Sequence, residues 1–137
     1  MLDKAAAVPG DYGWVAPTYQ VDQRGIDAFT QITGGALNIC EIKGGGKVPQ
    51  YASICGGKSR CHFLSAAKPD PIRGYGFLGL AVDDAPFIKK TTWEYIIRPT
   101  IAQTMGWAIL VGTPKGRNWF HSEHIKGQSA EHPDYDS

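Results

Sequence analysis

Two nearly continuous apolar segments predict the buried strands of this chain. They cover residues 77–84 (FLGLAVDD) and 107–114 (WAILVGTP). Strands of this composition are typical of a parallel sheet whose two faces are both covered. A shorter strand is expected over residues 12–17 (YGWVAP), where Pro17 closes it. We therefore expect the two longer segments to be buried on both faces.

Apolar residues at helical spacing predict helices around these strands. Residues 1–8 have the composition of the end of a helix, which Pro9-Gly10 stops. Thr18 can cap a helix over residues 19–32. A short helix is also expected over residues 118–127. The expected apolar face of the helix over residues 19–32 consists of Val21, Ile26, Phe29 and Ile32.

A further helix is predicted over residues 91–104, between the two apolar strands. Thr91 and Glu94 fit a capping box at its start. Pro99 should kink it, because proline has no backbone N–H, and Gly106 should end it. Its apolar stripe is expected to consist of Trp93, Ile96, Ile97 and Ile101.

The middle of the chain predicts a β-hairpin insertion around residues 36–66. We expect a strand, a flexible turn, two strands joined by GGKS (56–59) and a proline-containing loop, in the order 36–42, 44–48, 51–54, 60–66 and 67–74. Outside this insertion, strands and helices alternate along the chain. Such alternation predicts an α/β fold with a mostly parallel sheet flanked by helices.

Composition limits the possible functions. The chain has 137 residues, of which 42% are hydrophobic and 20% charged, as in an ordinary globular domain. We expect one domain over residues 1–127 and, over residues 128–137, a flexible polar tail or the start of a linker. The net charge of +1 gives no overall field for nucleic acid or membrane, so contact with DNA would need a local basic patch. No segment is long and apolar enough to span a bilayer, and no membrane partner is expected.

Polar residues follow both apolar strands. Asp83 and Asp84 end the first, and Thr113 follows the second. Ligands of open α/β sheets bind at the carboxyl ends of strands, so these residues could form a metal–nucleotide site. One carboxylate would help to hold Mg²⁺, often through water, and its neighbour could accept a proton from an attacking water. Alternatively, the two aspartates simply end a strand and begin a turn.

A longer pattern resembles a known family. The segments IRGYGFLGLAVDDA and WEYIIRPTIAQTMGWAILVGTPKGRNWF, within residues 72–120, resemble the terminase large subunits, which are viral DNA-packaging ATPases. PGDYGWVAPTYQ (9–20) resembles the second strand of that family and the turn after it. The resemblance implies a P-loop NTPase-like, ASCE-type α/β fold, here incomplete.

The resemblance also implies roles for individual residues. Asp83 stands at the Walker B acid, which organises Mg²⁺, normally through water. Asp84 stands where the family usually has a catalytic glutamate, and its side chain is one methylene shorter. Gly112 and Thr113 match the motif that couples hydrolysis to DNA movement. Arg73, just before the strand, could act as an arginine finger toward a neighbouring subunit, or could form a loop ion pair or contact DNA phosphate.

One element of the family is missing from the sequence. ATP-binding domains of this class hold phosphates with the motif G-x-x-x-x-G-K-[ST]. GGKS (56–59) matches the end of this motif, but Ala52 stands at the position of its first glycine. GGKS also lies between two expected strands, so we interpret it as a hairpin turn. The chain is expected to begin after the P-loop of the family and to stop before its nuclease domain, and to bind no cofactor tightly by itself.

The resemblance implies the partners and the location of the complete protein. It would use Mg²⁺ and ATP to move double-stranded DNA into a capsid, with the portal protein and a small terminase subunit, in the cytoplasm of the bacterial host. A non-catalytic, degenerate ATPase-like interaction module is the alternative. Another P-loop class, such as a helicase, would share Walker B but not the run GTPKGRNWF.

The remaining polar clusters have two interpretations each. His121 and His124, with His132 nearby, could bind a metal, but solvated histidines fit the polar sequence around them. Basic residues near the strand ends could contact phosphates or simply face water: Lys89, Lys90, Lys115 and Arg117. The tryptophans are interpreted as packing residues: Trp14, Trp93, Trp107 and Trp119.

Overall fold

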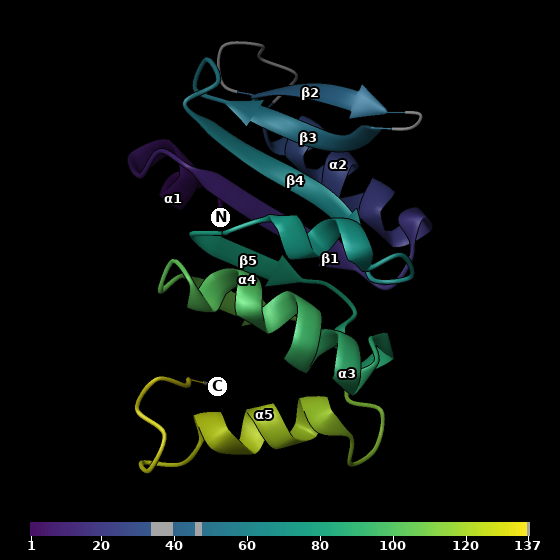
Figure 1. Cartoon of the computed structure of the whole chain (residues 1–137), viewed down its shortest axis with the longest axis vertical. Helices are drawn as coiled ribbons and strands as arrows, with labels where there is room; N and C mark the ends of the chain where they lie inside the picture. The colour runs from purple at the N-terminus through teal and green to yellow at the C-terminus, as the bar shows by residue number, and fades with distance from the viewer. Residues whose placement is uncertain (34–39, 46–47, 137) are drawn as a thin grey trace.

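Six strands form one mixed sheet in the computed structural model, which describes residues 1–33, 40–45 and 48–136 (Figure 1). The strands are β1 (Asp11–Ala16), β2 (Cys40–Gly45), β3 (Val48–Ile54), β4 (Ser59–Ser65), β5 (Gly79–Val82) and β6 (Trp107–Leu110). Their order across the sheet is β2-β3-β4-β1-β5-β6. The α/β fold with a sheet flanked by helices, predicted from the sequence, is therefore confirmed.

Four of the strands, β4, β1, β5 and β6, are parallel. Val15 of β1 pairs with Leu64 of β4 on one side and with Val82 of β5 on the other. Val82 in turn pairs with Leu110 of β6. Because these four residues stand at or near the ends of their strands, the carboxyl ends of all four strands meet at one edge of the sheet.

The hairpin insertion supplies the antiparallel part of the sheet. β3 pairs with both β2 and β4, and the turn between β3 and β4 contains Gly56, Gly57 and Lys58. GGKS is therefore a hairpin turn, as predicted. The expected turn over residues 44–48 is wrong in part, because Gly44 and Gly45 belong to β2. Residues 46–47, and residues 36–39 of the expected first strand, lie outside the described residues.

One face of the sheet is covered by α1 (Leu2–Ala7) and α2 (Tyr19–Ile32). Both helices begin and end within a residue or so of their predicted bounds. Thr18 occupies the N-cap of α2, but its side chain makes no capping hydrogen bond. Ile26 and Phe29 are buried as expected, whereas Ile32 is 73% exposed. The prediction for Ile32 is wrong because the helix ends there, beyond the sheet that covers the other two side chains.

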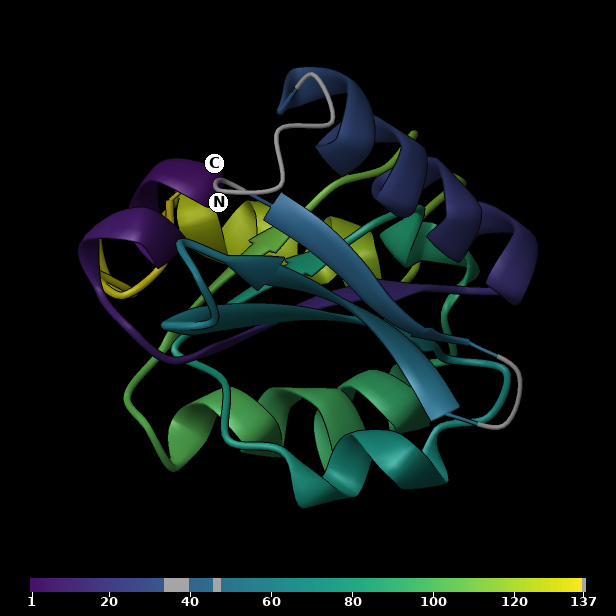
Figure 2. The same ribbon diagram turned by 90° about the horizontal axis from the view of Figure 1, so that it is seen from above.

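The opposite face is covered by a layer of helices, which come after β4 and before β6 along the chain (Figure 2). It consists of the 3-10 helix η1 (Asp70–Gly74), α3 (Lys90–Thr92), the π-helical segment η3 (Trp93–Ile97) and α4 (Arg98–Ala102). The loop expected over residues 67–74 is therefore corrected to a 3-10 helix over most of its length. Pro71 near the start of η1 allows this, since its fixed φ suits the first helical turn.

The helix predicted over residues 91–104 differs in detail from the prediction. The expected disturbance by Pro99 takes the form of the π-helical segment directly before Arg98, where the turn widens. The predicted capping box is wrong, because Lys89 rather than Thr91 is the N-cap of the helix. Glu94 instead lies 3.5 Å from Lys90 Nζ, as an i,i+4 ion pair. The apolar stripe of the predicted helix is confirmed by the burial of Trp93, Ile96 and Ile97.

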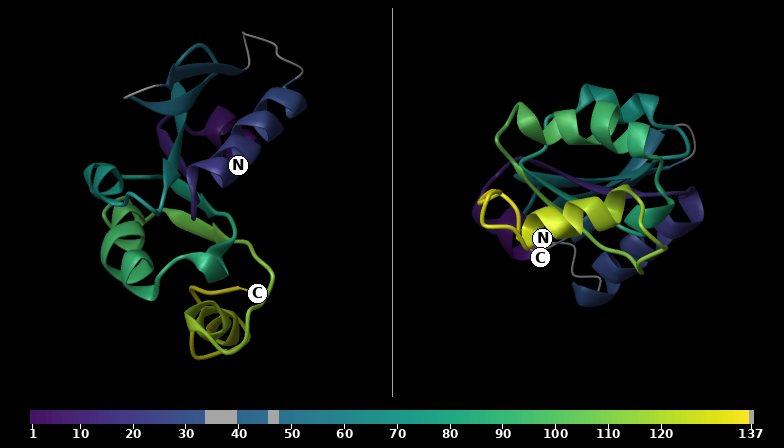
Figure 3. Two further views of the ribbon diagram at one scale, coloured as in Figure 1. Left: turned by 90° about the vertical axis from the view of Figure 1, so that its right-hand side faces the viewer. Right: turned by 90° about the horizontal axis from the view of Figure 1, so that it is seen from below.

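β6 is the strand at one end of the sheet. Its carboxyl end leads to α5 (Trp119–Gly127), which lies at the end of the molecule opposite the β2–β3 hairpin (Figure 3). Burial on both faces is confirmed for β5 but is wrong for β6, where Ile109 is 50% exposed. The apolar composition of β6 could not reveal this, because exposure depends on which strands and helices lie beside it.

Two apolar cores lie on the two faces of the sheet. The core under η1, η3 and α4 contains Val15, Leu64, Ile72, Phe77, Leu80, Val82, Trp93, Ile97 and Trp119, among others. The core under α1 and α2 contains Ala5, Tyr12, Ile26, Phe29, Ala52, Ile54, Cys61 and Phe63. Because a core packs against each face, the sheet is held from both sides, which fixes the loops at its carboxyl edge.

Among the described residues, no helix is both long and apolar enough to cross a membrane.

Candidate functional site

The two adjacent aspartates lie at the carboxyl edge of the parallel strands. The backbone N–H of Asp83 donates to the carbonyl of Val15 in β1, with an N···O distance of 2.9 Å. Two residues later, the N–H of Ala85 donates to the carbonyl of Val111 after β6, also at 2.9 Å. The turn that carries Asp83 and Asp84 is therefore fixed by backbone hydrogen bonds to the neighbours of β5 on both sides.

Asp84 adopts a backbone conformation that residues other than glycine rarely use. Its φ of 46° and ψ of 40° are left-handed. Aspartate tolerates this region better than most residues, at a cost of about 1 kcal/mol. The backbone N–H of Asp84 donates to Oδ1 of Asp83 at 3.0 Å. Strained backbone of this kind is concentrated at functional sites, which makes this turn a candidate site.

An arginine from a different element reaches this turn. Arg24 of α2 places its Nη1 3.9 Å from Oδ2 of Asp84, and the two side chains are 73% and 36% exposed. Such an open pair contributes little to stability, but it brings a positive charge beside the acid pair. Arg24 is not among the site residues predicted from the sequence. The available signal was its place on the exposed side of a helix that begins where β1 ends.

Gly112 and Thr113 follow β6 at the same edge. A side-chain Cβ on Gly112 would overlap the ring of Pro86, so only glycine lets the two loops approach so closely. Thr113 is exposed. Since β5 and β6 are adjacent parallel strands, the structure brings Asp83, Asp84, Gly112 and Thr113 to one edge.

Arg73, the remaining predicted site residue, lies on η1 rather than on a strand end. Its Nε lies 3.8 Å from Oδ1 of Asp70, one helical turn earlier, and its side chain is 57% exposed. A loop ion pair is one of the interpretations that the sequence left open for this residue. The exposed guanidinium remains accessible to a group outside the chain.

The donor set at the carboxyl edge suits magnesium in one specific way. Mg²⁺ is commonly held by one or two carboxylates together with waters and phosphate oxygens. The described residues contain no group of three or more histidine, cysteine or acidic side chains that could hold a metal alone. The carboxylates of Asp83 and Asp84 are donors of the type that Mg²⁺ uses together with phosphate oxygens. The same finding gives no support to a metal site at His121 and His124.

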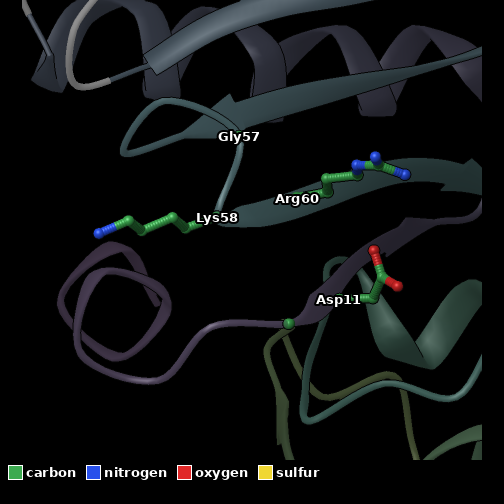
Figure 4. A pocket seen from close by; sticks show the side chains of 5 residues that line it. Asp11, Gly57, Lys58 and Arg60 are labelled. Carbon is green, nitrogen blue, oxygen red and sulfur yellow. The ribbon is translucent and has the colours of Figure 1, made fainter.

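The GGKS turn borders a hollow at the opposite, amino edge of the sheet. Gly10, Asp11, Gly57, Lys58 and Arg60 line this hollow, which has a volume of about 190 Å³. Figure 4 shows the side chain of Lys58 extending away from Arg60 and Asp11. The Lys58 ammonium therefore does not converge with Arg60 and Asp11 on one point.

A second polar cluster lies near this amino edge. Nε2 of His62 lies 2.8 Å from Oδ1 of Asp11, and the His62 side chain is only 10% exposed. The His62 ring packs against Tyr75, with ring centroids 4.5 Å apart. Burial, and secondarily the Asp11 carboxylate, raise the pKa of the Tyr75 phenol above its ordinary value. This cluster joins β1 to β4. Asp11 is the first residue of β1, whereas the acid pair lies beside Val15, near the other end of that strand.

Comparison with known proteins gives two curated relatives. The chain is 28% identical to the terminase large subunit of Thermus virus P23-45 over 163 aligned positions, which cover 96% of this chain and 33% of that protein. It is 38% identical over 63 residues to the terminase large subunit of Thermus phage G20c, across 46% of this chain and 13% of the relative. No protein-family model matches. The chain thus spans about a third of the length of the P23-45 protein.

Solved structures give the same answer for the fold. The large terminase ATPase domain of Thermus phage P74-26 is similar with a TM-score of 0.72 and 26% identity, over 99% of this chain and 66% of that domain. An arginine-to-alanine variant of that domain gives a TM-score of 0.72 and 25% identity. The mixed six-stranded sheet with flanking helices is therefore the fold of part of such a domain.

Proposed function

Because the chain is a partial terminase large subunit that corresponds to part of the ATPase domain, we propose that its carboxyl edge serves ATP-driven DNA packaging. The observation that carries this proposal is the meeting of the acid pair with Gly112 and Thr113 at the ends of adjacent parallel strands. In open α/β sheets, nucleotide ligands bind at this edge.

The proposed roles follow from chemistry and position. Asp83, kept in place by its backbone hydrogen bond to Val15, would hold Mg²⁺ through water. Asp84, whose backbone is left-handed, would accept a proton from an attacking water or orient it. Thr113 faces the terminal phosphate with an exposed hydroxyl. When bound, Mg²⁺ supplies charge that neutralises the phosphate oxygens.

Arg73 has a separate proposed role. Its side chain is 57% exposed and forms an open ion pair with Asp70. In a ring of subunits it would reach the nucleotide of a neighbour and stabilise negative charge during phosphoryl transfer. The proposed partners of the complete protein are double-stranded DNA, the portal protein and a small terminase subunit, in the cytoplasm of the bacterial host.

The chain alone is expected not to turn over ATP. Its sequence contains no G-x-x-x-x-G-K-[ST], and the side chains around its GGKS turn diverge. Nucleotide affinity should therefore be weak without a phosphate cradle from outside these residues. Magnesium-dependent hydrolysis by the pure chain would show that this part of the proposal is wrong.

The packaging role is tested in the phage genome that encodes the chain. Asp83→Asn removes the charge for Mg²⁺ with little change in size, so empty capsids should accumulate and nuclease-resistant DNA should be lost. Asp134→Asn, the same change at an exposed residue of the tail, is the matched control and should package normally. Normal DNA content in the Asp83→Asn phage would refute the proposal.

One observation favours a second candidate function. Asp84 stands where the family usually has the longer glutamate. A degenerate domain of this kind would bind the portal or another subunit without hydrolysing ATP. Under that alternative, Asp83→Asn leaves packaging unchanged, so the same experiment separates the two candidates.

A further inference from the structure

Four successive residues after the acid pair each contact the segment that follows β6. Ala85 donates its backbone N–H to the carbonyl of Val111 at 2.9 Å. The ring of Pro86 occupies the space that a side chain on Gly112 would need. We call these contacts, together with the two described next, the loop ladder.

The next two contacts involve side chains. The Phe87 ring lies under Lys115, with Nζ 4.6 Å from the ring centroid. The carbonyl of Ile88 accepts a hydrogen bond from the indole Nε1 of Trp119 at 2.7 Å. This last bond is buried, since Ile88 is 4% and Trp119 is 8% exposed. The loop ladder therefore runs from an internal backbone bond to a buried indole at the start of α5.

The position of Trp119 is itself fixed. Asn118 is the N-cap of α5, and its side chain accepts a hydrogen bond from the backbone N–H of His121 at 3.2 Å. The Trp119 ring stacks on Trp93, with centroids 5.6 Å apart and an interplanar angle of 17°. Trp119 thus connects the segment after β6 both to the loop after β5 and to the helical layer.

We infer that Trp119 is a positioning residue for the turn that carries Asp83 and Asp84, acting through the loop ladder. The inference rests on the proposed function of that turn, and it adds how the site is controlled. Because every residue from 85 to 88 is tied to the segment 111–119, the two loops move as one body. A displacement of Gly112 and Thr113 by a phosphate would therefore reach the acid pair and α5 together.

Trp119→Phe tests this inference, with Trp93→Phe as the matched control. The first change removes the hydrogen bond to Ile88 and leaves its carbonyl unpaired, while keeping an aromatic ring in the stack. The second makes the same change in the same stack, where the buried indole Nε1 of Trp93 has no hydrogen-bond partner among the described residues. The two variants thus differ chiefly in the loop ladder.

The first measurement is amide hydrogen exchange by NMR. Trp119→Phe should speed exchange of the Ala85 amide, and of Asp84 beside it, by about tenfold or more, because a buried carbonyl loses its partner. Trp93→Phe should change both rates much less. Equal effects of the two variants on these amides would overturn the inference, whether or not the site binds nucleotide.

The second measurement is Mn²⁺ affinity by electron paramagnetic resonance, with Mn²⁺ in place of Mg²⁺. Trp119→Phe should weaken Mn²⁺ binding by about tenfold, because the loss of residues that orient metal ligands has effects of this size. Trp93→Phe should leave the Mn²⁺ affinity unchanged. If the unchanged chain binds no Mn²⁺, the missing phosphate cradle accounts for it, and the exchange result alone decides on the loop ladder. Equal Mn²⁺ affinities in the two variants would exclude the positioning role.

A second variant covers the case in which Trp119→Phe does not fold. Gly112→Ala leaves Trp119 intact but pushes Pro86 away from the other side of the loop ladder. It should accelerate exchange at Ala85 as well. Gly74→Ala is its control, because a Cβ there meets nothing within 4 Å. Unchanged exchange at Ala85 in Gly112→Ala would count against the inference.

Discussion

The two edges of the parallel sheet both carry glycine-containing loops with charged residues, but they differ in how those loops are held. At the amino edge, the GGKS turn and the start of β1 surround an open hollow in which Lys58 points away from its neighbours (Figure 4). At the carboxyl edge, the turn of Asp83 and Asp84 is bonded to β1 and to the residue after β6.

This difference shows why a short sequence signature is a poor guide to a site. The letters G-K-S occur in the hairpin turn, where antiparallel strands reverse and side chains diverge. The acid pair ends an apolar strand, and four parallel strands bring it to the same edge as Gly112 and Thr113. The meeting of residues from separate strands at one edge makes the carboxyl edge a candidate site.

The largest expected effect concerns Trp119. Trp119→Ala removes a buried ring and its hydrogen bond to Ile88, which should lower the free energy of unfolding by about 3–5 kcal/mol. Lys58→Ala, at the exposed hairpin turn, should change it by less than about 0.5 kcal/mol. Urea denaturation measures both. Similar values for the two variants would remove the contrast between the edges.

A smaller effect is expected at Gly112. Gly112→Ala forces a methyl group into the Pro86 ring and should cost about 1–3 kcal/mol in the same denaturation experiment. Gly74→Ala on η1 has open space around its new methyl group and should be neutral or slightly stabilising. If Gly112→Ala is as stable as Gly74→Ala, the loops at the carboxyl edge are not closely packed.

The strained backbone of Asp84 gives an effect of opposite sign. Asp84→Gly should raise the free energy of unfolding by about 0.5 kcal/mol, because glycine adopts a φ of 46° without strain but loses more freedom on folding. Thermal unfolding at neutral pH detects the change. A substantial loss of stability would mean that the Asp84 side chain stabilises the turn instead of straining it.

The smallest effect belongs to the amino edge and appears only in alkali. Burial raises the pKa of Tyr12, and burial with the Asp11 carboxylate raises the pKa of Tyr75. Both phenols therefore keep their protons in the folded chain at a pH where the unfolded chain loses them. The folded state binds more protons, so stability should fall as pH rises above about 10.

Tyr75→Phe tests the alkaline effect. It should reduce the loss of stability between neutral pH and alkali, since one of the two phenols no longer titrates. Tyr95→Phe, at a side chain that is 68% exposed, is the control and should leave the pH profile as it is. A profile of Tyr75→Phe that matches that of the unchanged chain would contradict the assignment.

The elements that could be predicted from the sequence are those whose own pattern is sufficient. Periodicity and apolar content predict helix α2 and strand β5. The sequence also predicts that Thr113 lies near the acid pair, because both follow strands of one parallel sheet. The π-helical segment was missed, since a proline predicts a disturbance but not its form. Exposure of β6 was missed because it depends on neighbouring elements, not on its own residues.

The candidate site was predicted in part for the same reason. Asp83 and Asp84 stood out as charges at the end of an apolar strand. The left-handed backbone of Asp84 has no sequence signal, because aspartate accepts several turn conformations. Arg24 and Trp119 were missed because each meets the turn only after distant parts of the chain have folded together.

The central claim is that the turn of Asp83 and Asp84 faces a magnesium-bound triphosphate across from Thr113. Its most direct test is NMR of the ¹⁵N-labelled chain titrated with Mn²⁺ and ATP, since the paramagnetic ion broadens nearby amide signals. We predict that the signals of Asp83, Asp84, Gly112 and Thr113 broaden first and that Asp83→Asn abolishes this. Broadening centred on Lys58 and Asp11, or on His121 and His124, would contradict the claim.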